Sequence, residues 1–259
     1  MGLRTKIRRY LYARKFKNKN ILELNYSGKN IFITGANSGI GLELTHKFLN
    51  LNNKVFATYR NNSENLKKIN NKNLTLIKCD QKNLSEIENI KKEIKNIPIN
   101  LLINNAGIFG PPYSEQKLEN LNFQNFQDTL MINSLSVIKI TQVILNAVKK
   151  DTLNMIVNIS SEGGSITRND EGNAYIYRTS KSALNSITKN MSLDLFKNYN
   201  IVVFAIDPGN VQSGMNPGGI VKTPVCANLI INIIASQGKK LNGKFINLFR
   251  RGILPVLRV

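Results

Sequence analysis

Seven short apolar runs alternate with longer amphipathic stretches from Ser27 onward, and this alternation leaves few folds open to the chain. A short run rich in β-branched residues predicts a buried strand, whereas apolar residues spaced three and four apart over a longer stretch predict a helix. We expect strands at residues 30–34, 54–59, 74–79, 99–104, 154–160, 200–206 and 244–248. Helices are expected to begin near Gly39, Ser63, Asn83, Asn125, Ala174 and Pro224.

Strands that alternate with helices are joined by right-handed crossovers, which build a parallel sheet with helices on both faces. The sequence therefore predicts an α/β fold: one doubly wound, Rossmann-type domain over residues 28–259, with a seven-stranded, mainly parallel sheet. Ligands of such folds bind at the carboxyl ends of the strands. Residues 1–27 are expected to form a separate basic extension.

Positive charge is concentrated at the amino end of the chain. The 259 residues carry a formal charge of +20, and residues 1–20 contain eight Lys or Arg and no acidic residue. This segment could be an organelle-targeting peptide, a membrane-surface helix or a disordered tail. Elsewhere Lys and Asn fall in polar loops, which indicates solvated faces rather than a nucleic-acid surface. We expect a cytoplasmic protein, with organelle targeting as the alternative, and no membrane span because no run approaches 18 apolar residues.

Metal and redox chemistry find little support in the sequence. Cys79 and Cys226 are the two cysteines, and their separation matches no zinc or redox motif. We interpret them as buried thiols in a reducing compartment. With His46 as the one histidine, we expect no metal site.

A glycine-rich turn follows the first predicted strand and precedes an apolar helical pattern. Glycines here let the backbone turn sharply, approach a phosphate and pack the new helix on the sheet, while the free N–H groups of the helix amino end face the phosphate. The residues predicted to bind a dinucleotide at this turn are Gly35, Asn37, Ser38, Gly39, Ile40 and Gly41.

The end of the second strand predicts which dinucleotide binds. An acidic residue there would hold both ribose hydroxyls of NAD, but this chain has Tyr59 followed by Arg60. A guanidinium pairs with a 2′-phosphate, which a carboxylate would repel. We therefore expect NADP(H), with NAD(H) as the alternative.

Other residues, most of them polar, follow the remaining strands, where a parallel sheet presents them to a ligand. This group comprises Asp80, Gln81, Asn104, Asn105, Ala106, Gly107, Ser160, Ser161, Pro208, Gly209, Val211 and Ser213.

Tyr177 and Lys181 stand four residues apart in a predicted helix, so their side chains are neighbours on one face. A phenol titrates near pH 10, and a neutral-pH proton donor needs roughly 4 kcal/mol of phenolate stabilisation. One ammonium at about 4 Å in a partly buried setting supplies about that much. The pair is a candidate acid, although any helix can contain Tyr and Lys at this spacing.

These motifs together resemble the short-chain dehydrogenase/reductase family. The resemblance runs from residue 28 to about residue 248, and the stretch from Gly164 to Asn185 is similar to the C-factor and sniffer-like carbonyl reductases. It implies that Tyr177 exchanges a proton with the carbonyl oxygen and that Ser161 hydrogen-bonds this oxygen. Lys181 would lower the pKa of Tyr177 and bind the nicotinamide ribose, and Asn133 would hold a water that relays protons to Lys181. The implied reaction is hydride transfer between NADPH and a ketone, aldehyde or quinone.

Two departures from the family pattern concern the substrate side of the site. Sixteen positions separate Ser161 from Tyr177, about three more than usual, which leaves Ser160 as an alternative catalytic serine. The segment after Ser213 is short for a substrate lid, which would mean an open pocket or lost activity. The family also implies a homodimer. The alternative to an enzyme is a dinucleotide-binding sensor or interaction protein that contacts nucleic acid or a membrane through its basic tail.

Overall fold

Seven parallel strands form one central sheet in the computed structural model, which describes residues 26–148 and 152–249. Their order is β3-β2-β1-β4-β5-β6-β7, and each neighbouring pair is parallel. The order of the strands reverses between β1 and β4, which is where doubly wound sheets bind ligands. The strands are β1 (Asn30–Ile33), β2 (Lys54–Tyr59), β3 (Leu74–Lys78), β4 (Leu101–Asn104), β5 (Met155–Ile159), β6 (Val202–Asp207) and β7 (Phe245–Asn247).

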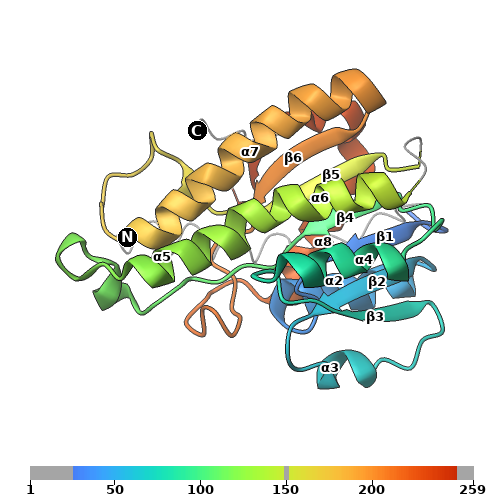
Figure 1. The fold of residues 1–259 in the computed structure, drawn as a ribbon, viewed down its shortest axis with the longest axis horizontal. Helices are drawn as coiled ribbons and strands as arrows, with labels where there is room; N and C mark the ends of the chain where they lie inside the picture. The colour runs from blue at the N-terminus through green and yellow to red at the C-terminus, as the bar shows by residue number, and fades with distance from the viewer. Residues whose placement is uncertain (1–25, 149–151, 250–259) are drawn as a thin grey trace.

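Helices cover both faces of this sheet (Figure 1). On the face toward the viewer, α4, α6 and α7 pack over one apolar cluster that includes Phe32 and Ile156. On the other face, α2 and α8 pack together over a second cluster that includes Phe204. The helices are α2 (Gly39–Asn50), α3 (Glu64–Lys67), α4 (Leu84–Glu93), α5 (Phe123–Leu130), α6 (Ser136–Ala147), α7 (Tyr175–Tyr199) and α8 (Thr223–Gln237). The predicted doubly wound α/β fold is thereby confirmed, and the sheet is parallel throughout.

Helix starts follow local capping chemistry at several places. The side chain of Asn83 accepts hydrogen bonds from the first turn of α4, and Asn122 does the same for α5. Such caps satisfy N–H groups that have no partner inside the helix. The helix predicted near Asn125 therefore starts earlier, at Phe123. It continues through a π-helical turn, Met131–Leu135, into α6.

The helix Phe123–Ala147 is the one candidate membrane span found among the described residues, by length and composition. Half of its most apolar window is buried inside the protein. It packs against α4 and α7, as a core helix of a globular domain does. The predicted basic extension, residues 1–27, lies outside the described residues except for its last two.

Candidate active site

A cleft of about 820 Å³ lies at the carboxyl ends of the central strands. It is lined by the loops that follow β1 through β6, so residues far apart in the sequence meet there. Three residues predicted to face a ligand, Gly41, Asn104 and Asn133, do not line it. The predicted residues that do are Gly35, Asn37, Ser38, Gly39, Ile40, Tyr59, Arg60, Asp80, Gln81, Asn105, Ala106, Gly107, Ser160, Ser161, Tyr177, Lys181, Pro208, Gly209, Val211 and Ser213.

The glycine-rich turn is packed so closely that side chains would not fit. Gly35 has φ +61°, and a Cβ there would lie 2.8 Å from Ala106 Cα. At Gly41 a Cβ would overlap the carbonyl of Gly35 and lie 2.5 Å from Asn105 Nδ2. Gly41 was predicted to bind the cofactor, but the structure places it behind the turn, where it lets α2 approach β1. Asn105 fixes the turn by donating to the carbonyls of Thr34 and Gly35, both at 3.0 Å.

The amino end of α2 fits a phosphate group. Ser38 at its N-cap makes no side-chain capping hydrogen bond, and its first turn contains no acidic residue. The N–H groups of this turn have no partner inside the helix, and the helix dipole favours an anion there. The turn and the helix end therefore suit the pyrophosphate of a dinucleotide.

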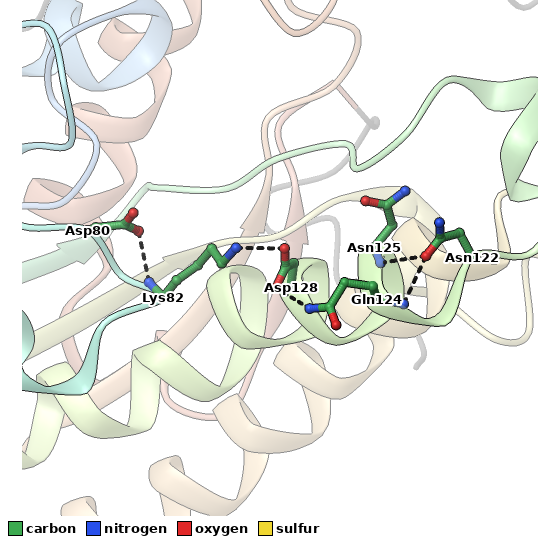
Figure 2. A network of polar contacts seen from close by, with 6 residues as sticks. All are labelled: Asp80, Lys82, Asn122, Gln124, Asn125 and Asp128. Carbon is green, nitrogen blue, oxygen red and sulfur yellow. Dashed lines mark hydrogen bonds and ion pairs between the residues drawn. The ribbon is translucent and has the colours of Figure 1, made fainter.

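Arg60 and Asp80 follow neighbouring strands at one end of the cleft. Arg60 is exposed at the end of β2, where it can reach a ligand. The loop that carries Asp80 is held against α5 by the network in Figure 2. Asp80 accepts from the Lys82 N–H at 3.0 Å, and Lys82 Nζ pairs with Asp128 on α5 at 2.6 Å. Gln124 also donates to Asp128, at 3.2 Å.

Tyr177, Lys181 and Ser161 meet at the middle of the cleft. Tyr177 is the third residue of α7, and its hydroxyl is hydrogen-bonded to the Ser161 side chain. Lys181 Nζ lies one helical turn further, 5.9 Å from the centre of the tyrosine ring. It donates to the Ile159 carbonyl at 2.9 Å. The predicted pair therefore shares one face of a helix, beside a hydroxyl contributed by the end of β5.

Burial controls the protonation of this pair. Desolvation raises the pKa of Tyr177 to about 12, which the Ser161 hydrogen bond offsets only in part, and Asp207 raises it further. Desolvation lowers the pKa of Lys181 to about 8, against an opposing contribution from Asp207. The expected lowering of the Tyr177 pKa by Lys181 therefore does not dominate in the cofactor-free protein, where the net shift is upward. Withdrawal from water outweighs attraction to an ammonium that does not contact the phenol directly.

The structure separates the two candidate serines by their partners. Ser160 is buried, and its hydroxyl donates to Asn185 at 2.7 Å. Ser161 is partly exposed, accepts from the Gly163 N–H and contacts Tyr177. Ser161 is thus the hydroxyl available to a ligand, while Ser160 ties β5 to α7.

Asn133 lies behind the cleft in the π-helical turn. Its Oδ1 accepts from the Ile108 N–H at 2.8 Å, and its Nδ2 donates to the Ile108 carbonyl at 2.8 Å and to Ser180 Oγ at 2.9 Å. These bonds engage the side-chain amide with the loop after β4 and with Ser180 on α7, so a water relay would need the main-chain carbonyl. Short π-helical turns occur frequently at functional sites.

The loop after β6 is short and firmly closed. A bridge pairs Val211 with Val221, and a second bridge pairs Ser213 with Asn216. A Cβ at Gly219 would overlap the backbone of Val211. The expected short segment is thus a folded loop beside the cleft, closed by one parallel and one antiparallel bridge, and Met215 borders the cleft with half of its surface exposed.

Sequence patterns missed several residues that line the cleft. They neighbour predicted residues at the same strand ends, so extending each motif by two positions finds most of them. The group comprises Thr58, Asn61, Asn62, Cys79, Ile108, Phe109, Ile132, Ile159, Glu162, Asp207, Asn210, Gly214, Met215 and Asn216. Both cysteines are buried free thiols, as expected.

Residues 29–219 match the family model for short chain dehydrogenases. The protein belongs to the short-chain dehydrogenase family. C-signal of Myxococcus xanthus is 30% identical to this dehydrogenase over 151 residues, which cover 58% of this chain and 89% of that protein. The 3-oxoacyl-acyl-carrier-protein reductase of Rickettsia prowazekii is 29% identical over 195 residues, or 74% of this chain and 76% of that protein.

Solved structures of carbonyl reductases resemble this dehydrogenase along most of its length. The carbonyl reductase Sniffer of D. melanogaster superposes with a TM-score of 0.80 at 29% identity, covering 90% of this chain and 100% of that one. The NADPH-bound carbonyl reductase from chicken fatty liver has a TM-score of 0.78 at 25% identity, with the same coverage. The protein is thus an oxidoreductase by family, and its likeness to these reductases extends over nearly the whole described domain.

Proposed function

We propose that this short-chain dehydrogenase is an NADPH-dependent carbonyl reductase. The observation that carries the proposal is the Tyr177 hydroxyl, which is hydrogen-bonded to Ser161 inside a cleft whose glycine turn suits a dinucleotide. The substrate is a ketone, aldehyde or quinone. NADPH would supply the hydride, and the protein would position and polarise the carbonyl group.

Tyr177 would donate its proton to the carbonyl oxygen as hydride reaches the carbonyl carbon. Because the pKa of Tyr177 is raised by burial, the phenol is protonated throughout the neutral range and ready to donate. Ser161 would donate a hydrogen bond to the same oxygen as negative charge develops on it. Lys181, charged below pH 8, would stabilise the phenolate left behind. Asn133 would not contact the substrate but would hold the loop after β4 in place through its hydrogen bonds to Ile108.

The Tyr177→Phe variant tests this proposal. It removes only the hydroxyl, so NADPH should still bind while turnover with a carbonyl substrate falls by about a thousandfold or more. Tyr175→Phe is the matched control, because Tyr175 lies on the same helix with 41% of its surface exposed. Turnover of the Tyr177→Phe variant equal to that of the control would refute the mechanism.

NADP(H) is proposed over NAD(H) because Arg60 lies at the end of β2 and no acidic residue follows that strand directly. The NADPH-bound chicken reductase supports this choice. Arg60→Ala should weaken NADPH binding at least tenfold and leave NADH binding nearly unchanged. Lys78→Ala on the neighbouring strand is the control, since Lys78 is exposed and does not line the cleft. Equal loss for both cofactors in the Arg60→Ala variant would contradict the assignment.

A homodimer is proposed through α5, α6 and α7. Leu135, in the π-helical turn between α5 and α6, and Leu193, on α7, expose 45% and 56% of their surfaces, and that turn packs against α7. Replacing both leucines by lysine should shift the mass measured by light scattering from dimer to monomer. A monomeric wild-type protein would refute this part of the proposal.

The competing function is a dinucleotide-binding sensor that acts through the basic amino-terminal segment, which lies outside the described residues. A screen of NADPH oxidation against aldehydes, ketones and quinones separates the two functions, because only the reductase consumes NADPH. We propose a cytoplasmic location. A fluorescent fusion with and without residues 1–25 tests it against organelle targeting or membrane contact through this segment.

A further inference from the structure

Gln116 is a buried amide that connects the substrate side of the cleft to the catalytic helix. It ends the 3-10 helix Tyr113–Gln116, and none of its surface is exposed. Its Nε2 donates to the carbonyls of Phe109 at 3.0 Å and Pro111 at 2.9 Å. Its Oε1 accepts from the Tyr177 N–H at 2.9 Å, across 61 positions of sequence. Every bond that Gln116 makes thus holds either the loop after β4 or the backbone of Tyr177.

The first turn of α7 needs such an external partner. Its N-cap, Ala174, makes no side-chain capping bond and has φ +47°, a left-handed conformation that alanine rarely adopts. Asn173 before it also has a positive φ, of 57°. The N–H groups of a first turn have no partner within the helix and are normally capped by the residue that precedes it. For Tyr177, the side chain of Gln116 replaces that local cap.

The loop held by Gln116 also contacts the tyrosine ring. The Phe109 ring lines the cleft, and its centre lies 4.9 Å from that of Tyr177, with the rings tilted by 36°. On its other side the Phe109 ring stacks on Tyr113, at 6.3 Å between centres. Gln116 therefore holds two groups in a fixed relative position: the backbone of Tyr177 and the Phe109 ring that packs against the Tyr177 side chain.

The carbonyl of Tyr177 is fixed from the opposite direction. Ser180 Oγ donates to it at 2.7 Å, and Asn133 donates to Ser180 Oγ. Asn133 binds Ile108, so the same loop is connected to both the N–H and the carbonyl of Tyr177. Without Gln116 only one of these two ties would remain.

We infer that Gln116 is a positioning residue for the proposed reduction: it caps the catalytic helix at Tyr177 and locks Phe109 against the tyrosine ring. The inference rests on the proposed function. A misplacement of about 1 Å at a reacting group can cost about a hundredfold in rate. Gln116 acts through Tyr177 and does not line the cleft.

The Gln116→Met variant removes all three hydrogen bonds and keeps a side chain of similar length. Its matched control is Asn53→Leu. Asn53 is equally buried, accepts from the Lys29 N–H at 3.0 Å and donates to the carbonyls of Tyr26 and Phe48, but it lies between α2 and β2, away from the cleft. Both variants should lower the melting temperature. Only Gln116→Met should lower kcat, by about ten- to a hundredfold, with NADPH affinity within about twofold of wild type.

Gln116→Glu keeps the experiment decisive if the methionine variant does not fold. A neutral carboxylic acid reproduces part of the amide pattern, since its carbonyl accepts from Tyr177 and its hydroxyl donates to one backbone carbonyl. A carboxylate instead faces two carbonyl oxygens and repels them. The kcat of this variant relative to wild type should therefore rise at least fivefold from pH 8.5 to pH 5.5.

The outcomes separate this inference from the proposed function. If none of the carbonyl compounds tested supports NADPH oxidation by the wild-type protein, the proposed function fails. If wild type is active, the inference is overturned by kcat in Gln116→Met equal to that of Asn53→Leu, or by a Gln116→Glu activity ratio that does not change with pH. A kcat loss confined to the Gln116 variants, with the predicted pH-dependent rescue, supports it.

Discussion

Lys181 should destabilise the domain that it serves, and Lys181→Met measures by how much. Lys181 has 4% of its surface exposed, and desolvation lowers its pKa from 10.5 to about 8. Because one pKa unit corresponds to about 1.4 kcal/mol, keeping this group charged in the folded protein at pH 7 costs about 3 kcal/mol. Methionine fills a similar volume without charge.

The sign of the pH dependence follows from the lowered pKa. Between about pH 8 and 10.5 the unfolded chain binds more protons at Lys181 than the folded chain, so wild-type stability rises with pH in that window. The cost of the charge falls to about 1 kcal/mol at pH 9.5. Lys181→Met also removes the hydrogen bond to the Ile159 carbonyl. This loss subtracts about 1 kcal/mol, at either pH, from the stability that the variant gains by removing the buried charge.

Lys181→Met should therefore raise the free energy of unfolding by about 2 kcal/mol at pH 7 and leave it nearly unchanged at pH 9.5. Urea unfolding of the cofactor-free protein at pH 7 and pH 9.5 measures the free energy of unfolding. A turnover assay of the same variant should show that its catalytic activity is lost. Lys91→Met, at a lysine with 59% of its side chain exposed, is the control and should change stability by less than about 0.5 kcal/mol. A Lys181→Met variant less stable than wild type at pH 7, or a gain independent of pH, would refute the reasoning.

Three more results are expected from the same geometry. The kcat/KM for carbonyl reduction should fall above about pH 8, because Lys181 loses the charge that stabilises the phenolate; a flat profile to pH 9.5 would contradict this. Gly219→Ala should raise KM several-fold by opening the closed loop after β6, whereas Gly218→Ala should have no effect because a Cβ there meets nothing within 4 Å; equal effects would exclude this role for the loop. Hydrogen exchange by NMR should show the Tyr177 amide protected and the Ile176 amide fast, and a fast Tyr177 amide would argue against the bond to Gln116.

The fold was predictable because strand and helix periods alternate throughout residues 28–248, and this alternation leaves little freedom of topology. The cleft was predictable for a related reason: parallel strands bring all their carboxyl ends to one edge. The packing role of Gly41 could not be predicted, since the motif does not distinguish a glycine needed for packing from one that faces a ligand. The raised pKa of Tyr177 could not be predicted, because two residues on one helix face reveal nothing about how much water surrounds them.

Gln116 could not be found from the sequence at all. Its three hydrogen bonds depend on the path of the loop after β4 and on a helix that begins nearly 60 positions later. No local rule relates a glutamine at the end of a 3-10 helix to a distant N–H group. The only available signal was negative: the start of α7, at Ala174, lacks the Ser, Thr, Asp or Asn that usually caps a helix.

The first two turns of α7 thus contain both destabilising features and the hydrogen bonds that offset them, and all of these lie around Tyr177. A left-handed alanine at the entry and a desolvated ammonium at Lys181 both disfavour the helix as it stands. The hydrogen bonds of Gln116, Ser180 and Asn133 offset these costs. Gln116 binds the Tyr177 N–H, and Ser180, which Asn133 holds, binds the Tyr177 carbonyl. Because Gln116 and Asn133 bind the loop that borders the cleft, and Ser180 is joined to that loop through Asn133, the position of the tyrosine is set by that loop and not by the helix alone. A change in the loop sequence would therefore reach the proton donor directly, whereas a stabilising change elsewhere in α7 would leave it in place.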